Sequence, residues 1–203
     1  KAAAPSKDIH IPSPLPTTPD AQAAEDLRKI LDGQFGELRE DIREMLDDSF
    51  FLPKLDGTID DMRDALLPVL ERFRDAGYSY DSFSRANGGS GKPDRAVIGL
   101  ETLGHADLSA MVKAGVQWGL WGGAIDNLGT ERHRHYIKPT MDLELMGVYA
   151  MTEIGHGSNV AQLQTTATYD PETQEFIINS PTPSAMKVFL GNAARHGQIA
   201  AVF

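Results

Sequence analysis

The spacing of hydrophobic residues changes near Leu145, and this change most limits the fold. Between Asp20 and Leu145, hydrophobic residues recur at intervals of three or four, as in Leu27, Ile30 and Leu31, which predicts amphipathic helices. After Leu145, short segments rich in β-branched and aromatic residues predict strands at 147–152, 163–169, 175–179 and 197–203. We therefore expect an α+β chain, in which an all-α N-terminal helical domain precedes the start of an antiparallel β-barrel or sandwich.

Three segments follow from this pattern. Residues 1–19 are rich in proline and lack helical spacing, which predicts an extended arm. Residues 20–145 form the helical domain, and residues 146–203 form the first part of a β domain. So few strands have too few partners to close a sheet, and we expect the chain to be the front part of a longer protein.

Local signals refine the helical domain. Thr58 and Asp61 have the spacing of a capping box, and Pro68 predicts a kink or a restart in the helix that follows. Pro93 is a good first-turn residue for the next helix. One long helix is expected over 107–128, although it contains the glycines Gly115, Gly119, Gly122 and Gly123. Each glycine costs roughly 1 kcal/mol relative to alanine in a helix, so close packing or room for a ligand must compensate.

Composition excludes several classes of protein. The 203 residues carry a net charge of −10, which argues against a general nucleic-acid-binding protein, because such proteins need a basic face. The chain has no cysteine, so disulfides and thiolate chemistry are excluded here. No apolar run approaches the length of a membrane span, and the first residues lack the apolar core of a signal peptide.

Residues 149–159 read Tyr-Ala-Met-Thr-Glu-Ile-Gly-His-Gly-Ser-Asn, an apolar lead followed by a glycine-spaced loop with two hydroxyl side chains. Such a loop lets backbone N–H groups approach an anionic cofactor closely. Residues 87–92 are also rich in glycine and end in a lysine, as a phosphate-binding loop does. Pro93 follows Lys92, however, where that motif needs serine or threonine. A connector is the better interpretation of that segment.

A second motif, Lys-Val-Phe-Leu-Gly-Asn at residues 187–192, follows a predicted hairpin at 165–182. Together with the loop at 149–159, it resembles the flavin-binding middle domain of the acyl-CoA oxidase family, within the acyl-CoA dehydrogenase group. The resemblance is dense over 145–203 and looser over 93–144. It implies FAD as the cofactor, and it implies a C-terminal helical domain that is absent from these 203 residues.

The resemblance assigns roles to particular residues. Thr152 matches a threonine that contacts the flavin ring, and Tyr149 and Met151 match positions that flank the ring. Gly157 and Ser158 match the loop that approaches the pyrophosphate. The second flavin segment supplies Phe189, Gly191 and Asn192.

Two of these positions depart from the dehydrogenase pattern. Phe189 stands where tryptophan is usual, and Gly191 stands where dehydrogenases carry a hydroxyl residue. Glycine there resembles the oxidases, and the missing side chain is expected to leave room for dioxygen.

The implied reaction is the FAD-dependent α,β-dehydrogenation of acyl-CoA to trans-2-enoyl-CoA in fatty-acid β-oxidation, with electrons passed to O2 to give H2O2. The alternatives are an acyl-CoA dehydrogenase that uses an electron-transfer flavoprotein, a non-catalytic subunit of the same fold, and an inert fragment. The resemblance further implies an acyl-CoA substrate, a homodimer, and a cytoplasmic location, or a peroxisomal one in a eukaryote.

Other candidates are weaker. The resemblance places the catalytic glutamate beyond Phe203, so no catalytic residue is expected in this chain, and Glu153 belongs to the flavin loop. A metal site at His156 would need further ligands, which the sequence does not place nearby. The basic residues of 132–135 could meet CoA phosphates, but a solvated helix face is the better interpretation.

Overall fold

The computed structural model describes residues 20–203, so the predicted arm at residues 1–19 lies outside the described residues. The described residues fall into two compact units, 20–36 and 37–203, which are described separately. In the first unit, α1 (Ala21–Asp32) begins at Asp20, whose carboxylate accepts hydrogen bonds from the N–H groups of Gln22 and Ala23. The predicted apolar face of α1 is exposed, including Ile30 at 76%.

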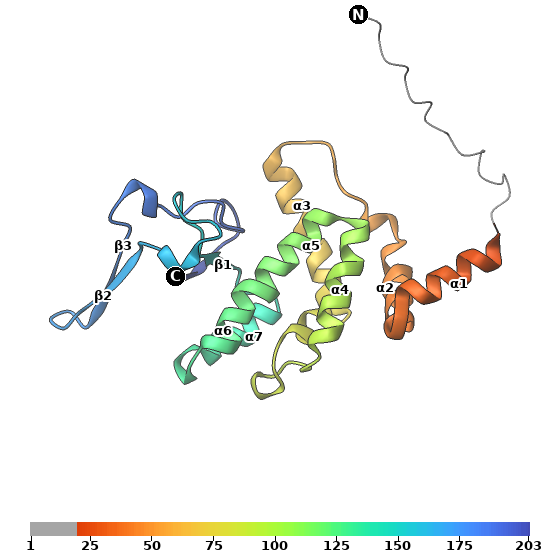
Figure 1. Ribbon diagram of the computed structural model, residues 1–203, viewed down its shortest axis with the longest axis horizontal. Helices are drawn as coiled ribbons and strands as arrows, with labels where there is room; N and C mark the ends of the chain where they lie inside the picture. The colour runs from red at the N-terminus through yellow and green to blue at the C-terminus, as the bar shows by residue number, and fades with distance from the viewer. Residues whose placement is uncertain (1–19) are drawn as a thin grey trace, which may run out of the picture. The chain divides into compact units, whose positions relative to one another are not determined.

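The second unit contains the predicted helical domain from residue 37 onward and the strands (Figure 1). Its α-helices are α2 (Gly36–Leu46), α3 (Ile59–Asp75), α4 (Pro93–Ala106), α5 (Leu108–Ala114), α6 (Gly122–Leu128) and α7 (Ile137–Met141). Short 3-10 turns connect them at η2 (Ser49–Phe51), η3 (Tyr78–Ser82), η4 (Arg85–Asn87) and η6 (Glu131–Tyr136).

Helix α3 begins as predicted but does not restart at its proline. The Thr58 hydroxyl accepts a hydrogen bond from the N–H of Asp61 at 3.2 Å, and the Asp61 carboxylate accepts one from the N–H of Thr58 at 2.8 Å. The helix then continues through Pro68 to Asp75. Burial of Val69, Leu70 and Phe73 directly after the proline stabilises this second half, which outweighs the missing N–H of Pro68.

The predicted helix over 107–128 contains a π-helical segment, η5 (Gly115–Trp121), between α5 and α6. The N–H of Gly122 donates to the carbonyl of Gln117, five residues earlier, as a widened turn requires. The Gln117 side chain is buried and donates to the carbonyls of Thr140 and Leu145, while its oxygen accepts the N–H of Gly147 at 3.0 Å. Gln117 therefore joins the helices to the start of the β region.

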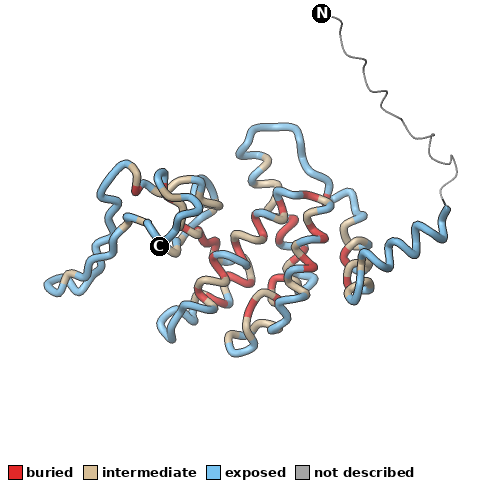
Figure 2. The backbone as a smooth tube through the Cα atoms, viewed as in Figure 1, coloured by how far each residue is buried: buried red, intermediate tan, exposed pale blue. Residues whose placement is uncertain are grey.

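The hydrophobic core lies among α3, α4, α5 and η5, where buried residues concentrate (Figure 2). Leu70, Leu103 and Trp118 are among its most buried side chains. The ring of Phe73 stacks on Tyr78 with centroids 4.6 Å apart and lies 6.3 Å from the ring of Trp118. This core holds the helices that support the β region.

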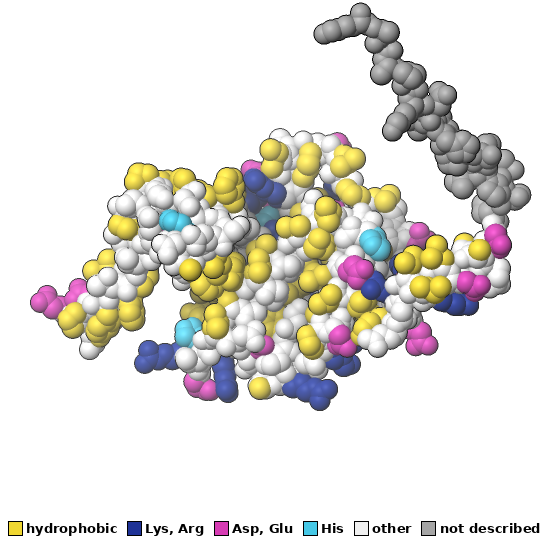
Figure 3. Space-filling model, viewed as in Figure 1, with side chains coloured by type: hydrophobic (Ala, Val, Ile, Leu, Met, Phe, Trp, Pro, Cys, Tyr) yellow, Lys and Arg dark blue, Asp and Glu magenta, His cyan; other side chains and the backbone are white. Residues whose placement is uncertain are grey.

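The strands form two pairs. Strands β2 (Thr166–Asp170) and β3 (Glu175–Asn179) make the predicted antiparallel hairpin, whose hydrophobic side chains remain exposed (Figure 3). Strands β1 (Gly147–Ala150) and β4 (Ile199–Val202) pair in parallel, with Gly147 opposite Ile199. This parallel pair departs from the predicted antiparallel arrangement, because the hairpin and the loops around it lie between β1 and β4 and return the chain in the same direction. No barrel closes among residues 20–203.

Candidate functional site

The two predicted flavin segments lie side by side. The N–H of Val188 donates to the carbonyl of Thr152 at 3.1 Å, and the N–H of Ile154 donates to the carbonyl of Met186 at 3.0 Å. The N–H of Gly155 adds a third bond, to the carbonyl of Ser184 at 2.9 Å. Segments about 30 residues apart in the sequence are therefore joined at one surface, which the sequence motifs alone did not require.

Several polar groups on this surface are unpaired. Within residues 20–203, the hydroxyls of Thr152 and Ser158 have no hydrogen-bond partner, and the N–H groups of Gly157, Ser158 and Gly191 donate to no acceptor. No heavy atom lies within 4 Å of the position that a Cβ at Gly157 would take, so its loop can be approached closely. Phe189 projects from the second segment with 95% of its surface exposed. These groups remain available to a ligand rich in hydrogen-bond acceptors.

Three predicted site residues use their side chains within the protein. The ring of Tyr149 packs on Phe203 with centroids 4.7 Å apart, and its hydroxyl lies 3.9 Å from the sulfur of Met151. The amide of Asn192 donates to the carbonyl of Gly147 at 3.0 Å and accepts a hydrogen bond from Lys113. These side chains therefore support the surface through contacts within the protein.

Glu153 is the buried centre of the first segment, with 1% of its surface exposed. Its carboxylate accepts hydrogen bonds from the N–H groups of Gln164 and Thr165, each at 2.9 Å, and from the hydroxyl of Thr165 at 2.7 Å. The ammonium group of Lys187 lies 3.2 Å away, and Nδ1 of His156 lies 3.1 Å away. The carboxylate thereby joins the flavin loop, the start of the hairpin and the second segment.

These contacts set the ionisation of Glu153. Burial raises its pKa, but the hydrogen bonds from Thr165, Gln164 and Lys187 together outweigh burial and hold the pKa below its ordinary value. Both oxygens are occupied, so Glu153 is not available as a base for proton abstraction. The sequence does not reveal this role, because the donors come from three separate segments.

Lys187 fastens the ends of the parallel strands. In addition to Glu153, its Nζ donates to the carbonyl of Met151 at 2.9 Å and to the carbonyl of Phe203 at 2.7 Å. Met151 directly follows β1, and Phe203 directly follows β4. A single side chain therefore orders the backbone next to Thr152.

The absence of a side chain at Gly191 has a packing cause. A Cβ there would lie 2.6 Å from Cγ2 of Val116 in η5. The space that we expected to remain open for dioxygen is thus filled by Val116 on this side of the loop. The glycine permits close approach of the π-helical segment to the second flavin segment.

Gly191→Thr, which introduces a dehydrogenase-like hydroxyl, is expected to lower the stability of the chain by about 2 kcal/mol because Val116 must move. The melting temperature should fall by about 5 °C. Val116→Ala in the same chain should recover part of this loss, as thermal unfolding followed by circular dichroism would show. Equal losses with and without Val116→Ala would contradict the packing explanation.

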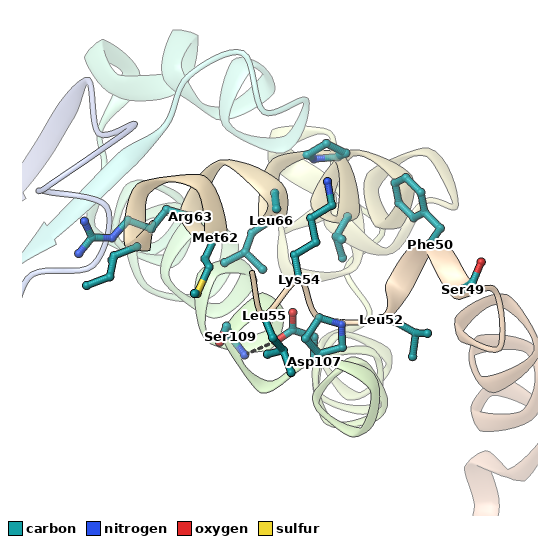
Figure 4. A pocket seen from close by; sticks show the side chains of 15 residues that line it. Ser49, Phe50, Leu52, Lys54, Leu55, Met62, Arg63, Leu66, Asp107 and Ser109 are labelled. Carbon is teal, nitrogen blue, oxygen red and sulfur yellow. Dashed lines mark hydrogen bonds between the residues drawn. The ribbon is translucent and has the colours of Figure 1, made fainter. Parts of the chain in front are cut away.

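Two adjoining cavities lie beside α3 and α5, and one of them borders the second segment. One, of about 380 Å³, is bordered by Gly191 and Asn192 and has mainly hydrophobic walls from α3, α5 and η5. The other, of about 470 Å³, lies between the segment 49–55, α3 and the start of α5 (Figure 4). Arg63, Leu66 and Ser109 border both cavities. Volumes of this size are typical of small-molecule sites, and the hydrophobic walls suit an apolar chain.

The remaining candidates from the sequence, His156 and residues 132–135, do not form a recognisable binding site among residues 20–203. His156 lies beside Glu153, and no cluster of three or more metal-ligating side chains occurs among residues 20–203. Residues 132–135 are exposed, and Arg134 pairs with Glu131 at 3.1 Å. Within the same described part of the chain, no helix is both long and apolar enough to cross a membrane.

Comparisons with known proteins agree with the predicted resemblance, although no family model matches the chain. The chain is 48% identical to peroxisomal acyl-coenzyme A oxidase 2 of Arabidopsis thaliana over 112 residues, which are 55% of this chain and 16% of that protein. It is 46% identical over 104 residues to a mouse acyl-coenzyme A oxidase-like protein, and spans 16% of it. The chain therefore spans a small part of the curated relatives that it matches.

Solved structures extend the similarity to most of the chain. Acyl-CoA oxidase 1 of Yarrowia lipolytica matches 88% of this chain and 26% of its own length, with a TM-score of 0.70 and 26% identity. Acyl-CoA oxidase 3 of the same yeast matches 88% of this chain and 25% of its own, with a TM-score of 0.68 and 30% identity. Butyryl-CoA dehydrogenase of Megasphaera elsdenii, at 19% identity and a TM-score of 0.60 over 81% of this chain and 43% of its own, shares the fold. The predicted resemblance and fold class are confirmed.

Proposed function

We propose that this chain, which resembles the acyl-CoA oxidases, is the N-terminal helical and first β part of an FAD-dependent acyl-CoA oxidase. The proposed reaction converts acyl-CoA to trans-2-enoyl-CoA and passes the electrons to O2, giving H2O2. One observation carries the proposal: the segments at 152–158 and 187–192 lie side by side and present unpaired hydroxyl and N–H groups. From the resemblance to this family, we expect the catalytic base to lie beyond Phe203.

The unpaired groups fit FAD, whose ring edge and pyrophosphate are rich in hydrogen-bond acceptors. The Thr152 hydroxyl and the N–H of Gly191 would hold the ring edge, while Gly157 and Ser158 would hold the pyrophosphate. Phe189 would pack its exposed ring against the cofactor. Bound FAD would supply the two-electron redox chemistry, and the protein groups would bind and orient it.

The acyl-CoA substrate is proposed to place its apolar chain toward the cavity beside Gly191 and Asn192. Leu66, Val112 and Val116 border this open cavity, so an acyl group would cover part of its apolar surface there. A dehydrogenase would use the same cavity and would differ only in the electron acceptor. Because packing against Val116 explains Gly191, the glycine alone does not distinguish an oxidase from a dehydrogenase. The test is whether air or an electron-transfer flavoprotein reoxidises the reduced full-length protein.

The assembly and location follow from the same proposal. We infer a homodimer, and a peroxisomal location in a eukaryote or a cytoplasmic one otherwise. A non-catalytic subunit would be favoured if the full-length protein lacked the glutamate that the resemblance places beyond Phe203.

Flavin binding is the direct test. The purified 203-residue chain, titrated into FAD, is expected to quench flavin fluorescence with a saturating curve near one FAD per chain. Thr152→Val should raise the dissociation constant about fivefold, because it removes one hydrogen-bonding hydroxyl with little change in shape.

The matched control is Thr168→Val, the same replacement at an exposed position of the β2–β3 hairpin, which should bind FAD as the unchanged chain does. A chain that leaves flavin fluorescence unchanged at high protein concentration would favour the inert-fragment alternative and reject the proposal. An equal effect of both valine variants would remove Thr152 from the site.

A further inference from the structure

A buried lysine contacts the second flavin segment. Lys113 lies in α5 with 9% of its surface exposed, and its Nζ lies 2.8 Å from Oδ1 of Asn192. The same Nζ lies 3.0 Å from Nδ1 of His196. The lysine therefore contacts the loop on both sides of residues 193–195 and joins it to the helical domain.

His196 continues the connection to α3. Its Nε2 lies 2.7 Å from Oδ1 of Asp64, and Arg195 pairs with the same carboxylate. Arg195 holds the pKa of Asp64 down to about 2, with a further contribution from His196. A continuous polar chain thus runs from Asp64 through His196 and Lys113 to Asn192, and on to the carbonyl of Gly147 in β1.

The loop of residues 189–196, which these polar contacts hold, has a strained backbone. Phe189, Asn192 and His196 adopt positive φ angles of 55°, 64° and 75°. Residues other than glycine rarely adopt such angles, although asparagine and histidine tolerate them better than phenylalanine does. Conformations of this kind persist only where the surroundings impose them, and they concentrate at functional sites. Two of these three residues, Asn192 and His196, are held by side-chain contacts with Lys113 and Asp64.

Burial of the Lys113 ammonium group has a desolvation cost that lowers the stability of the fold. Desolvation lowers the pKa of Lys113 to about 8, a shift that Asp64 opposes, so the group is still largely protonated at neutral pH. No carboxylate lies within salt-bridge distance of its Nζ among residues 20–203. Removing the ammonium group removes this desolvation cost, which offsets the two contacts that are lost with it. Little net stability is therefore expected from this ammonium group.

We propose that Lys113 is a positioning residue for the cofactor, which holds Gly191 and Asn192 in the conformation that binds the flavin. The inference rests on the proposed function for the identity of the ligand. It adds the residue, outside both flavin motifs, that orders the second of them. Val112 and Val116 on either side of it border the cavity beside Gly191, so the same helical stretch serves both features.

Lys113→Met keeps the aliphatic stem and removes the ammonium group. We expect the melting temperature to stay the same or rise, while the FAD dissociation constant rises about tenfold because a charged hydrogen bond is lost. Amide hydrogen exchange in the FAD-free chain should become at least about tenfold faster at Ala193, Arg195 and Gly197. Their N–H groups now donate to carbonyls of Leu190 and Asn192. Lys92→Met, at an exposed lysine, is the matched control and should change neither quantity.

His196→Asn is the second variant, because asparagine tolerates the positive φ but is too short to join Lys113 to Asp64. It should reproduce the faster exchange and weaker FAD binding, and it decides the matter if Lys113→Met does not fold. Unchanged exchange and unchanged FAD affinity in both variants would overturn the proposal. So would a fall in melting temperature with faster exchange throughout the chain, since that is the result of a general structural role. If the unchanged chain binds no FAD, the proposed function fails, and the exchange rates alone decide whether Lys113 fixes the loop.

Discussion

Glu153→Gln is expected to lower the melting temperature of the chain by roughly 10 °C, since breaking a buried ion pair is strongly destabilising. The N–H groups of Gln164 and Thr165 and the ammonium of Lys187 all point at the carboxylate. A glutamine amide offers one oxygen and turns an NH2 group toward these donors. Thermal unfolding followed by circular dichroism measures the change.

The same replacement should weaken FAD binding, because Glu153 joins the loop that carries Thr152 to the second segment. Glu172→Gln, at an exposed position of the hairpin turn, is the control and should leave the melting temperature within about 1 °C. If Glu153→Gln lost no more than this control, the buried carboxylate would not organise the site.

The pH dependence of stability provides an independent check. The pKa of Glu153 lies below its unfolded value of 4.5, so its ionised form stabilises the folded chain at all pH values above 4.5. This contribution is lost as the pH falls below 4.5 through the folded-state pKa. The unchanged chain should therefore lose more stability than Glu153→Gln on acidification from about pH 5, as urea unfolding at a series of pH values would show. Parallel losses in the two proteins would contradict the assignment.

Gly147→Ala is the second change with a large expected effect. A Cβ at this first residue of β1 would lie 2.0 Å from Cγ and 2.2 Å from Cδ1 of Trp121, which is a severe clash with the ring. Trp121 is buried, and its Nε1 donates to the hydroxyl of Thr140 at 2.9 Å, so it cannot move without breaking this bond. We expect a loss of about 3 kcal/mol or more, and a melting temperature lower by roughly 10 °C.

Gly123→Ala in α6 is the matched control. A Cβ there meets only the Asn127 amide at 4.0 Å, so alanine should raise stability by up to about 1 kcal/mol through its higher helix propensity. If both alanine variants were equally stable, the close approach of Trp121 to β1 would not exist in solution.

Much of the local structure could be predicted from the sequence. The capping box at Thr58, the start of α4 at Pro93 and the β2–β3 hairpin depend on neighbouring residues, and the structure confirms them. The π-helical segment and the parallel β1–β4 pair were not predicted. Each depends on contacts between distant residues, such as Gln117 with Gly147.

The candidate site divides in the same way. The groups that we propose for the flavin, such as Thr152 and Gly157, belong to short motifs, and the resemblance of those motifs predicted them. Glu153, Lys187 and Lys113 were not predicted as organisers, because a glutamate or lysine in a sequence reads first as a surface charge. Only the convergence of their partners in space makes them central.

The sequence by itself determined which stretches are helical or extended and which motifs resemble flavin-binding segments, since both properties depend on spacing over a few residues. Tertiary structure decided that the two flavin motifs adjoin, that Val116 fills the space beside Gly191, and that buried charges order the loops between them. Those features arise from hydrogen bonds and steric contacts between residues that are far apart in the chain, and hydrophobic periodicity carries no information about such contacts.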